Sequence, residues 1–453
     1  MTWDQLRHFH RQPEVLRAWQ RLWGPVLPWL LPRRRRLLLA LGGLVIAVSD
    51  PLKEVRSIPR TFGFEPNTAG TVIVIIAAAG FVLLWHELAR RFASWPAWCR
   101  RRPQLCLHAC FWVWLLALWN VTTHNVTART VLFGVALVFP LLLWRLGYML
   151  LTAQRGKMAG TTLADHWFYL WPVWGGTAVP FGKGLDYLSA CEAKDPDALA
   201  RSQLAGLKLV VLAALCGAGK DLMDGLVFGE DNAWRRALGN LTLAVPPTAE
   251  LMSATVAAPI WKGWVSIYAE LFRSVLAWGA KGHLVIGYLR LAGFNVFRNT
   301  YKPLLAETIV EFWNRYYYYF KELLVHFFFF PTFTRYFKQS PRLRLFTAVF
   351  AAAFLGNMYY HVIKAPAFMQ GDWPAVWATF NPRLVYCFFL ALGIWLSMQR
   401  EQRRSRGWVR PPGRRALAIF SVWTFFAFIH LWARGTQTHG QRLQFLLGLF
   451  GLG

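Results

Sequence analysis

Charged residues are scarce in this chain, and acidic residues are the scarcest of them. Only 16% of its 453 residues are Asp, Glu, Lys or Arg, and 22 acidic residues stand against 50 basic ones. Hydrophobic residues make up 56%, with 25 tryptophans and 35 phenylalanines. A chain of this length would form two or three domains if it were soluble, but so apolar a composition excludes that and favours a membrane protein.

Motifs for metal, nucleotide and cysteine chemistry are also missing. None of the six cysteines forms a Cys-x-x-Cys pair, and His108 between Cys106 and Cys110 has no second ligand pair at zinc spacing. The stretch "CGAGKD" lacks the first glycine and the closing hydroxyl residue of a phosphate loop. The sequence therefore predicts no metal and no resident cofactor.

Three further absences bear on the fold. The chain shows no convincing signal-cleavage site, no internal repeat, and no alternating apolar period of the kind that builds a membrane barrel. All regular structure is therefore expected to be α-helical. Residues 1–36 mix Trp, Leu and Arg as an amphipathic helix on a membrane surface does, and residues 37–453 are predicted to form a single polytopic domain.

Long apolar runs recur throughout residues 37–453, several of them close to the ~20 residues that cross a hydrocarbon core. The clearest are Thr71–Trp85, Leu105–Trp119, Val131–Tyr148, Leu204–Cys216, Leu345–Val362, Val376–Met398 and Ala416–Ala433. Weaker runs are Leu37–Val48, Leu163–Val179 and Ala257–Leu276. We predict about ten transmembrane helices.

The formal net charge of +28 comes from basic residues that we interpret as loop charges that set the membrane topology. Basic clusters at 33–36, 90–102 and 155–157 alternate with the loop 120–130, which holds only Arg129. The positive-inside rule then predicts a cytoplasmic N-terminus, and the basic loops favour contact with anionic lipids. No basic–aromatic module for single-stranded nucleic acid is present, so no nucleic-acid partner is expected.

The stretch "EFWNRYYYYFKELLVHFFFFPTF", residues 311–333, carries unusually many hydrogen-bonding groups for so apolar a segment. Taken as one helix from Glu311 to Phe330, it has a polar stripe with spacings of three and four. The stripe consists of Glu311, Arg315, Tyr318 or Tyr319, Glu322 and His326. Glu311–Arg315 and Glu322–His326 would be i,i+4 pairs. Two interpretations are open: the stripe lines a functional cavity, or it docks this helix against a neighbour.

A second candidate is "FLGNMYYHVIK", residues 354–364, inside a predicted span. Asn357 lies one turn before His361 on the same helical face. An asparagine can hydrogen-bond one imidazole nitrogen and leave the other free to accept a proton. A histidine at membrane depth is a functional candidate, although a neighbouring helix could equally satisfy it.

The order of these pieces resembles the membrane-bound O-acyltransferase family, most strongly over Gly279–Lys364 and more loosely over 141–434. The similar pieces are "VIGYLRLAGF", "EFWNRYYYYF", "HFFFFP" and "LGNMYYHV". Three positions depart from the family pattern. Tyr317 stands where the polysaccharide branch usually has a second histidine, His283 replaces an acidic residue, and Val362 replaces a glycine.

The resemblance implies a helical shell around a central tunnel, reached by an acyl thioester from the cytoplasmic side. His361 would be the general base on an acceptor hydroxyl, and Asn357 would set its tautomer. Arg315, Tyr317 or Asn314 would donate to the developing oxyanion. The predicted substrate-binding residues are Trp313, Asn314, Tyr318, Glu322, His326 and His283.

We therefore predict an O-acyltransferase of a bacterial inner membrane that acylates a glycan, a lipid or a secreted small molecule. Its co-substrate would be acyl-CoA or an acyl carrier protein thioester. Its other partners would be membrane lipids, a hydroxyl acceptor, and a periplasmic or membrane accessory protein. The alternatives are a transporter or flippase whose polar stripe lines the substrate path, and a catalytically inactive scaffold with the same fold.

Overall fold

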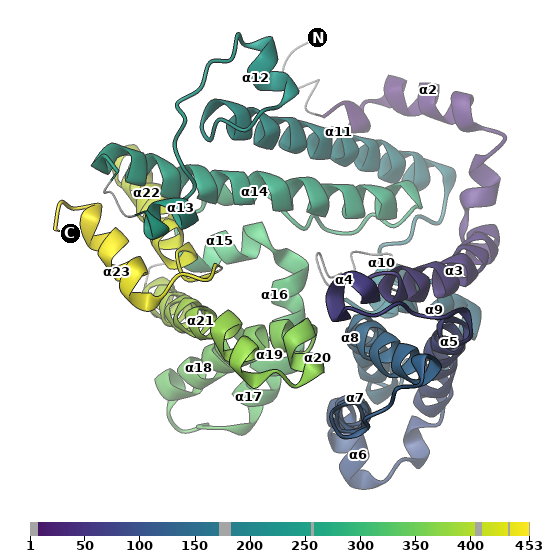
Figure 1. Cartoon of the computed structure of the whole chain (residues 1–453). Coiled ribbons are helices and arrows are strands. Elements are labelled where there is room, and N and C mark those ends of the chain that lie inside the picture. Colours follow the sequence, from purple (N-terminus) through teal and green to yellow (C-terminus); the bar gives the residue numbers. More distant parts are fainter. Residues whose placement is uncertain (1–7, 172–182, 255–257, 404–409, 434, 453) are drawn as a thin grey trace. The chain divides into compact units, whose positions relative to one another are not determined.

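The computed structural model describes residues 8–171, 183–254, 258–403, 410–433 and 435–452, and Figure 1 labels its helices. Every regular element in these ranges is helical, and the β-structure in them amounts to one isolated bridge between Glu192 and Phe294. The predicted all-α class is confirmed. Residues 172–179 of the predicted span Leu163–Val179 lie outside the described ranges.

The chain divides into two compact units. The first consists of Met1–Val210, Leu284–Phe297 and Ile363–Asp372, and the second of Val211–His283, Arg298–Val362 and Trp373–Gly453. Two of the boundaries fall within helices, one in α11 (Pro196–Leu226) and one in α14 (Ile260–Leu291). The predicted surface segment 1–36 and the acyltransferase-like core 141–434 stay predictions.

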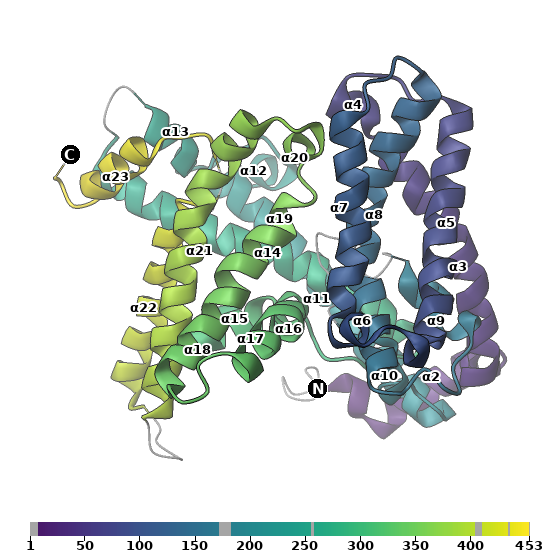
Figure 2. The same cartoon turned by 90° about the horizontal axis from the view of Figure 1, so that it is seen from below.

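The first unit is built around α8 (Val126–Gln154), which packs against α5 and α7, as Figure 2 shows. Its other helices are α2 (Pro13–Trp23), α3 (Pro32–Val55), α4 (Ile58–Phe62), α5 (Thr68–Arg90), α6 (Ala97–Arg101), α7 (Pro103–Asn120), α9 (Leu163–Leu170), α10 (Leu185–Ala190) and α20 (Pro366–Gln370). Small residues let α5 and α8 approach closely. A Cβ on Gly134 would lie 2.7 Å from Val74, so only glycine fits there.

One charged side chain of the predicted basic cluster at 33–36 is buried in the first unit. The Arg35 guanidinium pairs with Glu192 at 3.2 Å and donates to the backbone oxygens of Leu30 and Ala193 at 2.7 and 2.9 Å. Burial lowers the pKa of this guanidinium, and the Glu192 carboxylate partly offsets the effect. Arg35 thus joins the start of α3 to the segment that follows α10.

The second unit contains the candidate stretches 311–333 and 354–362. Its helices are α12 (Ala233–Ala237), α13 (Thr248–Ser253), α15 (Ile309–Tyr316), α16 (Tyr318–Leu324), α17 (Phe330–Arg335), α18 (Pro341–Phe350), α19 (Asn357–Val362), α21 (Trp373–Gln402), α22 (Pro412–His430) and α23 (His439–Gly448). Two π-helical turns, Val325–Phe329 and Ala351–Gly356, pack against each other. Gly356 permits this contact, because a Cβ there would lie 2.6 Å from the Phe328 ring.

Five helical segments in the described ranges are long and apolar enough to cross a membrane. They are Thr68–Arg90, Val126–Gln154, Pro196–Leu226, Pro341–Val362 and Trp373–Gln402. By the length and composition of these helices, the chain is an integral membrane protein. Four other predicted spans fall on α3, α7, α14 and α22. The total of about ten spans and the central tunnel stay predictions.

Candidate functional site

The predicted single helix from Glu311 to Phe330 is wrong. The chain leaves helical geometry at Tyr317, where φ is −141° and ψ is 60°, so that α15 ends and α16 begins there. A π turn then separates α16 from α17. The predicted polar stripe is therefore divided. Glu311 and Arg315 lie on α15, Glu322 lies on α16, and His326 lies in the π turn.

The charged members of the stripe find partners nearby. The predicted ion pair between Glu311 and Arg315 is confirmed. The Arg315 guanidinium also lies 3.4 Å from the backbone oxygens of Lys302 and Leu305, so it faces the turn before α15. Glu322 pairs with its neighbour Lys321 at 2.5 Å, a partner that helical spacing does not suggest.

Three of the predicted site residues meet around one phenylalanine ring. Phe320 has its centroid 5.6 Å from Tyr317, 6.4 Å from Trp313 and 6.2 Å from His361. Tyr360 completes the group at 4.8 Å. We call these five residues the Phe320 cluster. Most of its contacts are edge-to-face, the geometry that aromatic rings prefer.

The predicted general base lies in this cluster. His361 is half-buried, and its ring stands perpendicular to that of Tyr360 at 5.4 Å. Asn357 lies one turn earlier on α19 and is 2% exposed. The two residues thus keep the spacing that the sequence predicts, and the bond that would set the His361 tautomer stays a prediction.

Tyr317 packs against a residue that the sequence analysis did not identify. Its ring is 5.4 Å from Trp278 of α14, at an angle of 83°, and its side chain is buried. The signal that could have revealed Trp278 is the glycine-rich run "WGAKG" around it, because glycines inside a helix often mark a close backbone approach. The predicted residue His283 is buried on the same helix.

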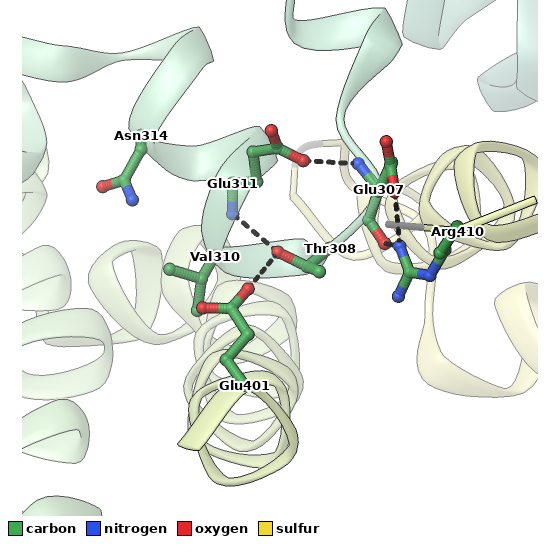
Figure 3. Close-up of a pocket in the computed structure, with 7 residues that line it drawn as sticks. All are labelled: Glu307, Thr308, Val310, Glu311, Asn314, Glu401 and Arg410. Carbon is green, nitrogen blue, oxygen red and sulfur yellow. Dashed lines mark hydrogen bonds and ion pairs between the residues drawn. The ribbon is translucent and has the colours of Figure 1, made fainter. Parts of the chain in front are cut away.

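A polar pocket of about 380 Å³ lies beside α15 (Figure 3). Its lining consists of Glu307, Thr308, Val310, Glu311, Asn314, Glu401 and Arg410. Thr308 donates to Glu401 at 2.5 Å and accepts from the backbone amide of Glu311, while Arg410 pairs with Glu307 at 2.9 Å. Two predicted residues, Glu311 and Asn314, belong to this pocket, and His361 does not line it.

The remaining predicted residues lie at the start of α16 and in the π turn that follows it. Tyr318 is half-buried, with the Lys321 ammonium 4.7 Å from its ring. His326 is half-buried in the π turn, 6.1 Å from Phe330. In the ranges that the structure describes, no three His, Cys, Asp or Glu side chains gather as metal ligands would.

The geometry thus separates two groups of predicted residues: Trp313, Tyr317 and His361 in an aromatic cluster, and Glu311 and Asn314 at a polar pocket. No model of a known protein family matches this sequence, and no curated protein does either. The resemblance to the membrane-bound O-acyltransferases therefore depends on the ordered motifs alone, and it stays a prediction.

Proposed function

We propose that this protein is a membrane-embedded O-acyltransferase with His361 as its general base. One observation carries the proposal. The rings of Trp313 and Tyr317, from the "FWNRY" motif, and of His361, from "NMYYH", all lie against Phe320. Residues more than 40 positions apart in the sequence thus meet around one ring, and this supports a site that combines a general base with an oxyanion donor.

The proposed reaction moves an acyl group from sulfur to oxygen. The His361 imidazole takes the proton from the acceptor hydroxyl, and the hydroxyl oxygen attacks the thioester carbonyl carbon. The carbonyl oxygen becomes an oxyanion, to which the Tyr317 hydroxyl donates a hydrogen bond. When the oxyanion collapses, the carbon–sulfur bond breaks, and the thiolate leaves with the proton held by His361. The products are an ester and a free thiol.

The surroundings of His361 suit this chemistry. Phe320, Tyr360 and Trp313 provide apolar walls that would keep water from competing with the acceptor hydroxyl. We infer that Asn357 holds the His361 tautomer from one turn away. The donor would be acyl-CoA or an acyl carrier thioester, and the acceptor a hydroxyl of a glycan, a lipid or a secreted small molecule. The proposed location is a bacterial inner membrane, with the N-terminus in the cytoplasm.

The transporter alternative has less support. It needs Glu311, Arg315, Glu322 and His326 on one continuous surface, but these residues are divided among α15, α16 and the π turn. The inactive-scaffold alternative is an outcome of the experiment that follows.

The test measures thiol release by the full-length protein in nanodiscs. Acetyl-CoA and palmitoyl-CoA serve as donors, with a monosaccharide or a diacylglycerol as the hydroxyl acceptor. We expect His361→Ala to lower the rate roughly 10²- to 10⁴-fold, the usual contribution of a general base. His124→Ala, at an exposed loop position before α8, is the matched control and should keep the parent rate.

Two results would count against the proposal. Equal rates for the parent and His361→Ala would show that His361 is not the base. A parent protein no faster than empty nanodiscs, with every donor and acceptor pair, would favour the inactive scaffold.

A further inference from the structure

The interruption at Tyr317 has no local cause in the sequence. Neither glycine nor proline occurs between Ile309 and Leu324, and these residues would otherwise continue one helix. Breaking a helix leaves backbone amides and carbonyls without their usual partners, and such groups must find others when they are buried. The partners come from residues 299–301, a segment of the second unit that precedes α15.

Asn299 satisfies the amides at the start of α16. Its backbone oxygen accepts from the Tyr318 amide at 3.1 Å, and its side-chain oxygen accepts from the Tyr319 amide at 3.2 Å. Asn299 is 1% exposed, so water does not compete for these bonds. It therefore performs for α16 what an N-cap residue performs for an ordinary helix, although it lies 19 and 20 positions before the two amides.

The next two residues satisfy carbonyls at the end of α15. The Thr300 hydroxyl donates to the Tyr316 oxygen at 3.0 Å, and the Tyr301 amide donates to the Arg315 oxygen at 2.7 Å. In a continuous helix, the Arg315 oxygen would accept from the Tyr319 amide. Here each atom of that pair has a partner in the segment 299–301, which we call the splint.

Helix α14 holds the splint and Tyr317 on the same face. Gly282 and Trp278 are one turn apart, and the Trp278 ring contacts Tyr317. A Cβ on Gly282 would lie 2.7 Å from the side-chain nitrogen of Asn299. The glycine therefore lets Asn299 approach α14 closely enough to bridge the interruption.

We propose that Asn299 and Thr300 are positioning residues of the site. The splint fixes Tyr317 in its non-helical conformation, and this directs its ring between the rings of Trp278 and Phe320, of which Phe320 also contacts His361. Without the splint, α15 and α16 would join into one helix and Tyr317 would leave this position. An effect of Asn299 and Thr300 on catalysis rests on the proposed acyltransferase function, whereas their placement of Tyr317 does not depend on that function.

A fluorine label tests the placement directly. We would introduce 3-fluorotyrosine at position 317 of the full-length protein and record its ¹⁹F resonance in detergent. Thr300→Val keeps the shape of the side chain and removes its donor, whereas Thr300→Ser keeps the donor. We expect the resonance to shift or broaden in Thr300→Val and in Asn299→Ala, and to stay at the parent position in Thr300→Ser. An unmoved resonance in folded Thr300→Val would overturn the inference.

A kinetic measurement tests the consequence. A misplacement of about 1 Å can cost roughly 100-fold in rate, so we expect Thr300→Val to lower kcat for thiol release at least tenfold. The KM for acyl-CoA should stay the same, and Thr300→Ser should restore kcat. Equal kcat values for Thr300→Val and Thr300→Ser would overturn the positioning role. If the parent releases no thiol, the proposed function fails, and the fluorine resonance still decides whether the splint places Tyr317.

Discussion

Replacing Gly293 by alanine should destabilise the first unit strongly. Gly293 follows α14 within "RLAGF", one of the pieces that resemble the acyltransferase pattern. Its φ is +96°, a conformation that residues with a side chain rarely adopt. A Cβ there would also lie 2.7 Å from the guanidinium carbon of Arg35. Alanine therefore brings both backbone strain and a clash with a buried charged group.

The clash should dominate the magnitude. Arg35 is 1% exposed and joins the Glu192 carboxylate and the Ala193 oxygen to the start of α3. Displacing it leaves these acceptors without their charged donor, and breaking a buried ion pair from one side costs about 3–5 kcal/mol. A left-handed backbone adds about 1–2 kcal/mol for a residue with a Cβ. The expected loss is therefore roughly 4 kcal/mol or more.

Gly63 provides the matched control, because it separates the strain from the clash. It ends α4 with a φ of +71°, and no atom lies within 4 Å of the position that its Cβ would take. Gly63→Ala should therefore cost only the strain of about 1–2 kcal/mol. The assay is equilibrium unfolding in mixed micelles with increasing sodium dodecyl sulfate, followed by tryptophan fluorescence.

A double-mutant cycle identifies the cause of the loss. If the clash acts through Arg35, then Gly293→Ala should cost much less in an Arg35→Met background, because the guanidinium is already gone. Additive effects of Gly293→Ala and Arg35→Met would refute this reasoning. Equal losses for Gly293→Ala and Gly63→Ala would refute it as well, since strain alone would then explain both.

Two further predictions concern buried charges in the second unit. Asp224 is 2% exposed and pairs with Lys220 and, at 2.7 Å, with Arg273. Asp224→Asn should therefore lower the free energy of unfolding by about 2 kcal/mol in the same micelle assay. An unchanged free energy of unfolding would contradict a role for this charge. The fully buried Arg442 donates to three backbone oxygens between α22 and α23, so Arg442→Met should release α23 and make the C-terminal region a preferred site of limited proteolysis. An unaltered cleavage pattern would exclude that anchoring role.

The sequence predicted those features that depend on local composition. Apolar runs predicted helices at the right places, and five of them meet the length and hydropathy of a membrane span. The burial of Arg35 could not be predicted, because its partner Glu192 is more than 150 positions away and the arginine belongs to a basic cluster typical of a membrane loop. The interruption at Tyr317 was missed for the same reason, since Asn299 and Thr300 cause it from outside the helix.

Helical spacing predicted one side-chain pair that the structure confirms, and that pair lies in a regular helix. Glu311 and Arg315 lie within α15 and form the predicted ion pair, and Asn357 and His361 lie within α19 and keep their spacing. The predicted Glu322–His326 pair spans the junction of α16 with a π turn, and it stays a prediction. Irregular helix of this kind is frequent at functional sites. Here one interruption lies at Tyr317, one π turn follows α16, and the other π turn precedes α19, which carries His361. The departures from helical geometry that divide the predicted stripe therefore lie on the same elements as the motif residues, and this supports the proposed site.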